Sequence, residues 1–349
     1  MINRTQEEII STWIGTIDNP IVTIRCLTYN HEAFIADALD SFLMQETTFP
    51  FEIIVHDDAS TDNTRQIIES YYNKYPKIIK PLFEEQNQYS KNKKFLGDII
   101  RNYAKGEYIA FCEGDDYWIS KTKLQQQYEA LIKHKNCYFC VHKTQIIGNV
   151  KNMNILPITN FDAGVIESDI FLNHMNIYNF HTSSFFFNKD KLLTYYSEDL
   201  KFIKVSMVGD IPLMLYFGCI GDVYYISDFM SVYRKNNKSS WTDKHLHDID
   251  VYVKTAISMI QMMKEFNIYT NNKYETMCKK YINNWEFGIY FRTNDYKKIK
   301  DKRYAGEWKL LSFSRKIVVY IGCIFPKLAD FIIKMHDKKR YKHIIISCL

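Results

Sequence analysis

Three clusters of polar and acidic side chains each follow a short β-rich run of the chain. The clusters are Tyr29-Asn30, Asp57-Asp58 and Glu113-Gly114-Asp115-Asp116. In an open α/β sheet, ligands bind beyond the carboxyl ends of the strands, so three such clusters would line one crevice. Their five carboxylates repel one another unless a cation neutralises them, and oxygen ligands of this kind suit Mg²⁺ or Mn²⁺ together with phosphate oxygens. Any single aspartate could instead cap a following helix, but the coincidence of three clusters predicts a metal-assisted site for a phosphate-bearing ligand.

The first 145 residues alternate between strand-like and helix-like patterns, and this alternation positions the clusters. The β-rich runs cover residues 21–26, 51–55, 78–83, 108–112 and 137–143. Hydrophobic residues recur at helical spacing between them, as in residues 34–43, 95–103 and 121–133. Strands and helices in turn are typical of βαβ units, so we predict an α/β fold with a mainly parallel sheet flanked by helices.

The alternation weakens after residue 150. The next segment is mixed, with strand-like runs at residues 183–187 and 223–226 and a helical run at residues 210–218. From Asp248 onward the hydrophobic spacing is helical. We therefore predict one domain over residues 1–240, made of the halves 1–150 and 151–240, followed by a helical C-terminal region over residues 241–349.

Charge is distributed unevenly, which limits the classes of partner. The net charge is +5, yet residues 297–349 hold fourteen Lys and Arg against four Asp and Glu, so the preceding part is net acidic. A nucleic-acid-binding protein has a basic main surface, so we expect no nucleic-acid partner. The first seventeen residues do not resemble a signal peptide, and the apolar run 317–325 is too short to span a bilayer. We expect a cytoplasmic protein with reduced cysteines.

Several other motifs for phosphate or metal are absent. The twelve glycines include no G-x-G pair and no G-x-x-x-x-G-K-[ST] run, which excludes the dinucleotide fingerprint, the kinase glycine loop and the P-loop. His31-Glu32 is not followed by a second histidine at the spacing of zinc proteases. The carboxylate clusters are therefore the motif that carries the chemistry.

The residues that carry these clusters resemble a known family. The run PIVTIRCLTYNHEAFIADALDSFLMQETTFPFEIIVHDDASTDNT (residues 20–64) and the run GEYIAFCEGDDYW (residues 106–118) resemble family 2 glycosyltransferases of the GT-A fold, of the bacterial surface-glycan type. The resemblance continues through HTSSFFFNKD, VGDIPLMLYF and SVYRKN, and so covers residues 20–240. It implies a metal-dependent, inverting transfer of a hexosyl or N-acetylhexosaminyl group from a nucleotide-sugar, with a UDP-sugar as the expected donor, to an acceptor hydroxyl. It also implies that residues 1–150 bind the nucleotide-sugar and residues 151–240 the acceptor.

The resemblance assigns roles to individual positions. Donor binding falls on Leu27, Tyr29, Asp58, Glu113, Gly114, Asp115 and Arg234, and the metal on Asp115 and Asp116. Tyr29 lies where the family packs an aromatic ring near the base, and Asp58 lies where a carboxylate accepts the pyrimidine N3–H. Arg234 could meet phosphate oxygens bidentately. Asp210 matches the general base that deprotonates the acceptor, and its alternative role is a plain helix cap.

The C-terminal segment has a basic and aromatic character of its own. Hydrophobic residues recur at helical spacing over residues 310–324 and again over residues 328–335, with lysines and arginines among them. This pattern is typical of a helix that lies on a membrane surface. The alternative is a helix that docks on the protein with its charges in water. A polyprenyl-diphosphate-linked glycan acceptor at the cytoplasmic face of the inner membrane would account for a helix on the membrane surface.

Two other functions compete with sugar transfer. Sugar-phosphate nucleotidyltransferases have a similar fold but begin with a glycine-rich, arginine-containing loop, which residues 27–32 lack. A non-catalytic nucleotide-sugar-binding protein on the same frame is expected to have lost one of the acidic clusters, and all three are present.

Overall fold

The computed structural model describes residues 4–89, 95–148, 155–175, 180–235 and 248–329. The chain forms two compact units. The first consists of Met1–Glu198 and Leu213–Lys235, and the second of Asp199–Pro212 and Asn236–Leu349.

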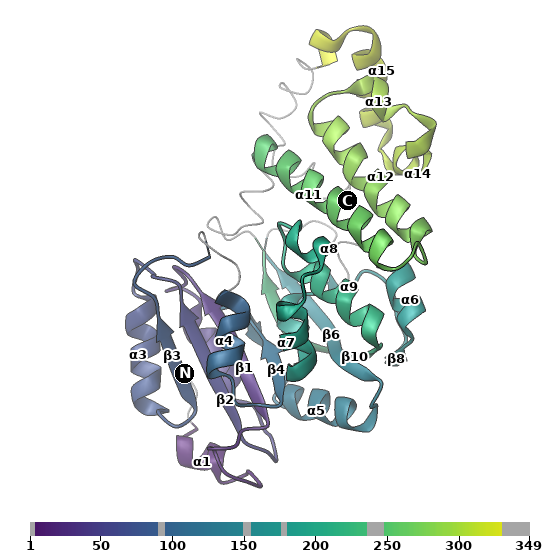
Figure 1. Ribbon diagram of the computed structural model, residues 1–349. Coiled ribbons are helices and arrows are strands. Elements are labelled where there is room, and N and C mark those ends of the chain that lie inside the picture. Colours follow the sequence, from purple (N-terminus) through teal and green to yellow (C-terminus); the bar gives the residue numbers. More distant parts are fainter. Residues whose placement is uncertain (1–3, 90–94, 149–154, 176–179, 236–247, 330–349) are drawn as a thin grey trace. The chain divides into compact units, whose positions relative to one another are not determined.

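The first unit is built on one sheet with the strand order β3-β2-β1-β4-β9-β6-β10-β5 (Figure 1). Its first four strands are parallel: β1 (Val22–Thr28), β2 (Phe51–Asp57), β3 (Ile79–Phe83) and β4 (Tyr108–Phe111). The helices that precede or connect them are α1 (Gln6–Ile10), α2 (Ile35–Leu43), α3 (Thr64–Lys74) and α4 (Phe95–Tyr103). Every residue of β2 is buried, as expected of a parallel strand covered on both faces. The predicted α/β alternation is confirmed in this half.

The sheet becomes mixed beyond β4. The remaining strands are β5 (Tyr117–Trp118), β6 (Cys137–Ile147), β7 (Ile155–Leu156), β8 (Gly164–Ile166), β9 (Phe186–Asn188) and β10 (Asp222–Arg234). The short strand β9 lies between β4 and β6 and is antiparallel to both, whereas β10 runs parallel to β6. β5 pairs antiparallel with Ser231 and Val232, near the end of β10. The strand predicted at residues 223–226 exists and is longer than predicted. The strand predicted at residues 183–187 is confirmed only at its end, because residues 182–184 form a 3₁₀ turn and β9 begins at Phe186.

The helices of the second half of this unit pack against the mixed part of the sheet or lie beside it. They are α5 (Lys123–Lys133), α6 (Ser168–Asn173), the 3₁₀ turn η1 (Thr182–Ser184), α7 (Lys189–Ser197) and α9 (Asp210–Ile220). Stacked rings of Phe139 and Phe187, 4.6 Å apart, fill the space where β6 and β9 meet.

The second unit is helical, in agreement with the spacing of its hydrophobic residues. Its helices are α8 (Lys201–Lys204), α11 (Ile249–Tyr269), α12 (Glu275–Arg292), α13 (Tyr296–Ile299), η2 (Lys302–Tyr304), α14 (Ala305–Leu310) and α15 (Phe313–Ile324). α11 packs along α12 and against α8 (Figure 1). Within the part of the chain described, no helix is both long enough and apolar enough to cross a bilayer.

Candidate active site

The three predicted clusters lie at the same edge of the sheet, because their strands are neighbours in register. Thr28 at the end of β1 pairs with Asp57 at the end of β2, and β4 pairs with β1 on its other side. Backbone hydrogen bonds join the turns that follow: the Asp58 N–H donates to the Thr28 carbonyl at 3.0 Å, and the Gly114 N–H donates to the Leu27 carbonyl at 2.8 Å. The three clusters therefore lie side by side at the carboxyl end of β1.

Gly114 allows the acidic turn to approach β1 closely. A Cβ atom at this position would lie 2.7 Å from Oγ1 of Thr28, 2.8 Å from its Cβ and 3.0 Å from Nδ1 of His31. These distances are shorter than van der Waals contact, so any larger residue would push Asp115 and Asp116 away from the strand.

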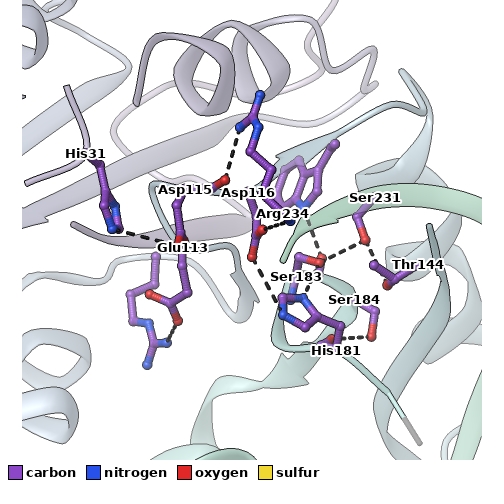
Figure 2. Close-up of polar contacts among 12 residues, drawn as sticks. His31, Glu113, Asp115, Asp116, Thr144, His181, Ser183, Ser184, Ser231 and Arg234 are labelled. Atoms are coloured by element: carbon purple, nitrogen blue, oxygen red, sulfur yellow. Dashed lines mark hydrogen bonds and ion pairs between the residues drawn. The ribbon is translucent and has the colours of Figure 1, made fainter. Parts of the chain in front are cut away.

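Asp116 and Arg234 are tied to each other through the end of β10 (Figure 2). Oδ1 of Asp116 accepts the Arg234 backbone N–H at 2.8 Å, and the Arg234 guanidinium donates to the Asp115 carbonyl at 3.0 Å. The guanidinium also pairs with Asp37 on α2 and lies 4.3 Å from the centre of the Tyr117 ring. Arg234 thus lies beside the predicted metal residues, with its charge shared between Asp37 and this turn.

Glu113 points toward a buried arginine, Arg25. Its carboxylate pairs with Arg25 at 3.2 Å, and the Arg25 guanidinium lies 3.4 Å from the centre of the Phe111 ring. Burial raises the pKa of Glu113, while Arg25 opposes that rise. Glu113 therefore has a charged partner within the protein.

The predicted base-binding residues lie at the end of β1 and after β2. Tyr29 is 44% exposed, so its ring is available to a ligand. Asp58 is buried, and its carboxylate accepts backbone N–H groups of Gln88 at 2.5 Å and Tyr89 at 3.1 Å. An ionised carboxylate has about four acceptor positions, so these two bonds fix Asp58 and leave it able to accept more. The Leu27 carbonyl accepts the hydrogen bond from the Gly114 N–H in the acidic turn.

Two histidines flank the aspartates, and neither was assigned a role from the sequence. Nε2 of His31 lies 3.8 Å from Oδ2 of Asp115, and Nε2 of His181 lies 3.7 Å from Oδ2 of Asp116 (Figure 2). Burial lowers the pKa of both, in His181 to about 3, so both imidazoles are neutral near pH 7. The position of His181 at the head of the HTSS block was the signal available in the sequence.

A chain of hydrogen-bonded hydroxyl groups contacts the Nδ1 side of the His181 ring. Its Nδ1 lies 2.8 Å from Oγ of Ser183, which donates to Oγ of Ser231 at 2.9 Å, and Thr144 lies 2.9 Å beyond. Trp118 donates from Nε1 to the Ser183 carbonyl at 3.0 Å. The His181 ring also stacks on Tyr233 with a centroid separation of 4.1 Å. The orientation of His181 is therefore set by several contacts.

Asp115 and Asp116 fit a divalent cation that is shared with a phosphate ligand. Burial and the charge of Asp115 raise the pKa of Asp116 well above its ordinary value, which is the cost of holding two carboxylates together without a counter-charge. Among the residues described, no three His, Cys, Asp or Glu side chains converge closely enough to hold an ion. Two carboxylates completed by phosphate oxygens and water are the usual protein contribution to Mg²⁺ sites.

Asp210 is the first residue of α9, as predicted. Its Oδ1 accepts the N–H of Ile211 at 2.9 Å, and burial raises its pKa. Asp210 belongs to the second unit, whereas α9 continues into the first from Leu213. The sequence assignment of Asp210 as the base stays a prediction.

Comparison with known proteins identifies relatives of this chain. The family model for Glycosyl transferase family 2 matches residues 24–194. The chain is similar to Escherichia coli WfgD, a UDP-Glc:alpha-D-GlcNAc-diphosphoundecaprenol beta-1,3-glucosyltransferase, with 32% identity over 133 residues. That segment is 38% of this chain and 49% of WfgD. For the first curated relatives, the matched segment spans between 36% and 49% of their own length.

Two solved structures are similar in fold. Residues 1–349 of Staphylococcus aureus TarS in complex with UDP-GlcNAc match with a TM-score of 0.56 and 20% identity, over 82% of this chain and 78% of that one. The mannosyltransferase PcManGT from Pyrobaculum calidifontis, in complex with GDP-Man and Mn²⁺, matches with a TM-score of 0.50 and 14% identity, over 92% of this chain and 88% of that one. The predicted GT-A architecture is thereby confirmed, and residues 24–194 of the chain belong to glycosyltransferase family 2, as the resemblance implied.

Proposed function

We propose that this protein is a metal-dependent, inverting glycosyltransferase that moves a sugar from a UDP-sugar to a hydroxyl of a lipid-linked glycan acceptor in bacterial surface-glycan synthesis. The observation that carries the proposal is the position of Asp58, Asp115 and Asp116 in turns that follow neighbouring parallel strands, at the same carboxyl edge of the sheet. This edge is where α/β sheets bind nucleotides. WfgD, whose name specifies a UDP-Glc donor and a diphosphoundecaprenol acceptor, and TarS, solved with UDP-GlcNAc, support the donor and acceptor classes.

Different residues are proposed to bind the base, hold the cation and deprotonate the acceptor in such a transfer. Asp58, held by two backbone N–H groups, accepts the N3–H of the uracil, and the exposed ring of Tyr29 packs near the base. Asp115 and Asp116 would hold a divalent cation, which would supply positive charge to offset that of the departing diphosphate. Asp210 takes the proton of the acceptor hydroxyl, because an inverting displacement needs one base. Mn²⁺ in the PcManGT complex supports a divalent cation here.

A donor panel tests this function. Full-length protein is incubated with UDP-Glc, UDP-GlcNAc, dTDP-Glc and GDP-Man, with and without Mn²⁺, and release of the free nucleoside diphosphate is measured. We expect slow hydrolysis of one UDP-sugar that requires the cation, because water can replace the acceptor. Release of pyrophosphate from a nucleoside triphosphate and a sugar phosphate would instead favour a nucleotidyltransferase. Binding of a donor without turnover, in the presence of polyprenyl-linked acceptors, would favour a non-catalytic binding protein.

We also propose that the second unit contacts the membrane through α15. The outward face of this helix is apolar: Phe313 is 79% exposed, Ile317 42% and Ile324 71%. The opposite face, with Val319 and Gly322, is buried within the unit. The surrounding segment, residues 297–349, is strongly basic, so the partner it fits is an anionic lipid surface. Residues 330–349, which carry the second half of the predicted amphipathic stretch, lie outside the described residues.

The double substitution Phe313→Ser and Ile324→Ser is expected to weaken binding to phosphatidylglycerol-containing vesicles about tenfold or more, because each lost apolar side chain removes about 1.5–3 kcal/mol of burial. Co-sedimentation at low salt measures the effect. The matched control is Ile268→Ser on α11, a residue that is also exposed in the second unit. Equal loss in the control, or no binding of the unsubstituted protein, would favour a helix that docks on the protein.

A further inference from the structure

We propose that the carboxylate of Asp37 competes with the diphosphate of the donor for the guanidinium of Arg234, and that this competition weakens donor binding. The inference rests on the UDP-sugar donor proposed above and on the phosphate contact expected of Arg234. Asp37 lies in the first turn of α2 and pairs with Nη2 of Arg234. A guanidinium binds carboxylates and phosphates in the same way, through N–H groups directed at anionic oxygens, so one anion can replace the other.

Arg234 is held beside the acidic turn by contacts that do not involve Asp37. Its backbone N–H donates to Oδ1 of Asp116 at 2.8 Å, and its Nη1 donates to the Asp115 carbonyl at 3.0 Å (Figure 2). The guanidinium also lies 4.3 Å from the centre of the Tyr117 ring, within the range of a cation–π interaction. We therefore expect Arg234 to stay beside the acidic turn when Asp37 releases it.

Asp37 is the partner of Arg234 that solvent reaches most easily. Its side chain is 58% exposed, whereas that of Arg234 is 16% exposed. An ion pair with an exposed member adds little to the stability of a fold, because water and salt screen the attraction and the side chains lose conformational freedom. Exchange of Asp37 for an anionic ligand therefore costs the fold little. It still weakens binding, because the ion pair must open before the ligand can bind the same charge.

Titration of the full-length protein with UDP and with uridine, at fixed Mn²⁺ concentration and low salt, tests the competition. Asp37→Asn is expected to tighten UDP binding about 2–5-fold, the range set by the strength of an exposed ion pair. Uridine has no diphosphate, so its affinity should stay the same. A change in the shape of the base site would alter the affinities of both ligands.

Loss of a negative charge can also attract UDP at long range, and two controls separate this effect from competition. Asp40→Asn removes the same charge from the same helix, at a carboxylate that accepts the Tyr71 hydroxyl at 2.7 Å, and should leave UDP affinity unchanged. In an Arg234→Met background, Asp37→Asn should also have no effect, because the group for which the two anions compete is gone. Thermal unfolding checks each variant, and Asp37→Ser removes the charge in a second way.

The outcomes separate this inference from the proposed function. Weaker or unchanged UDP binding in Asp37→Asn overturns the competition, and so does a tightening that persists in the Arg234→Met background or appears equally in Asp40→Asn. Each of these results leaves the UDP-sugar donor in place. Failure of the unsubstituted protein to bind UDP in the presence of Mn²⁺ would instead contradict the donor proposed above.

Discussion

Replacing Asp115 or Asp116 by asparagine is expected to abolish Mn²⁺-dependent binding of UDP while the fold stays intact. Each substitution removes one of the two carboxylates that are proposed to hold the cation. Removing a group that only orients a metal ligand costs about 10–100-fold in metal affinity. Loss of a ligand itself should therefore cost at least about 100-fold. In the unsubstituted protein, Oδ1 of Asp116 accepts the backbone N–H of Arg234, and the amide oxygen of an asparagine at this position can accept the same bond.

Calorimetry of UDP with and without Mn²⁺ measures this effect, and thermal unfolding checks the fold. Asp98→Asn on α4 is the matched control, because it removes the same charge from an exposed carboxylate that pairs with Arg101. Affinity equal to that of the unsubstituted protein in both the Asp115 and the Asp116 variants would show that neither residue holds a metal.

Asp210→Asn is expected to keep donor binding and to lose sugar transfer. Removal of a general base costs about 10²–10⁴-fold in rate. Asparagine preserves the size of the side chain and can still accept the Ile211 N–H, so a large loss would not come from damage to the start of α9. The matched control is Asp190→Asn, an exposed aspartate in the first turn of α7.

The pH dependence of the rate gives a second measure of the same role. A base must be ionised, and burial raises the pKa of Asp210 above its ordinary value. The rate of the unsubstituted enzyme should therefore fall as the pH drops through that raised pKa, and the Asp210→Asn variant should lack this limb. Transfer within a few-fold of the unsubstituted rate would remove Asp210 from the mechanism and direct attention to Glu167, Asp169 and Asp222. Loss of nucleotide binding would place Asp210 in the donor site.

The local spacing of hydrophobic residues was sufficient to predict the parallel half of the sheet. In β1 with α2, and in β2 with α3, a short apolar run is followed within about ten residues by a helix with hydrophobic residues at 3–4 spacing. The mixed half was harder to predict, because β9 has only three residues and pairs antiparallel with β4, far away in the sequence. Short strands of this kind depend on the neighbouring strands rather than on their own spacing.

The α/β alternation and the strand-end clusters that hold Asp58, Asp115 and Asp116 follow from the sequence alone, because the carboxyl ends of parallel strands meet at one edge whatever the details of packing. It could not determine the partners of those carboxylates. His181 reaches Asp116 only because β9 inserts between β4 and β6 and carries the turn before it to this edge. Likewise, Glu113 turns to Arg25, and Arg234 to Asp37, through contacts between residues 88 and 197 positions apart. Such pairings depend on which distant segments the core brings together and on the cost of burying a charge without a partner, and only the tertiary structure decides both.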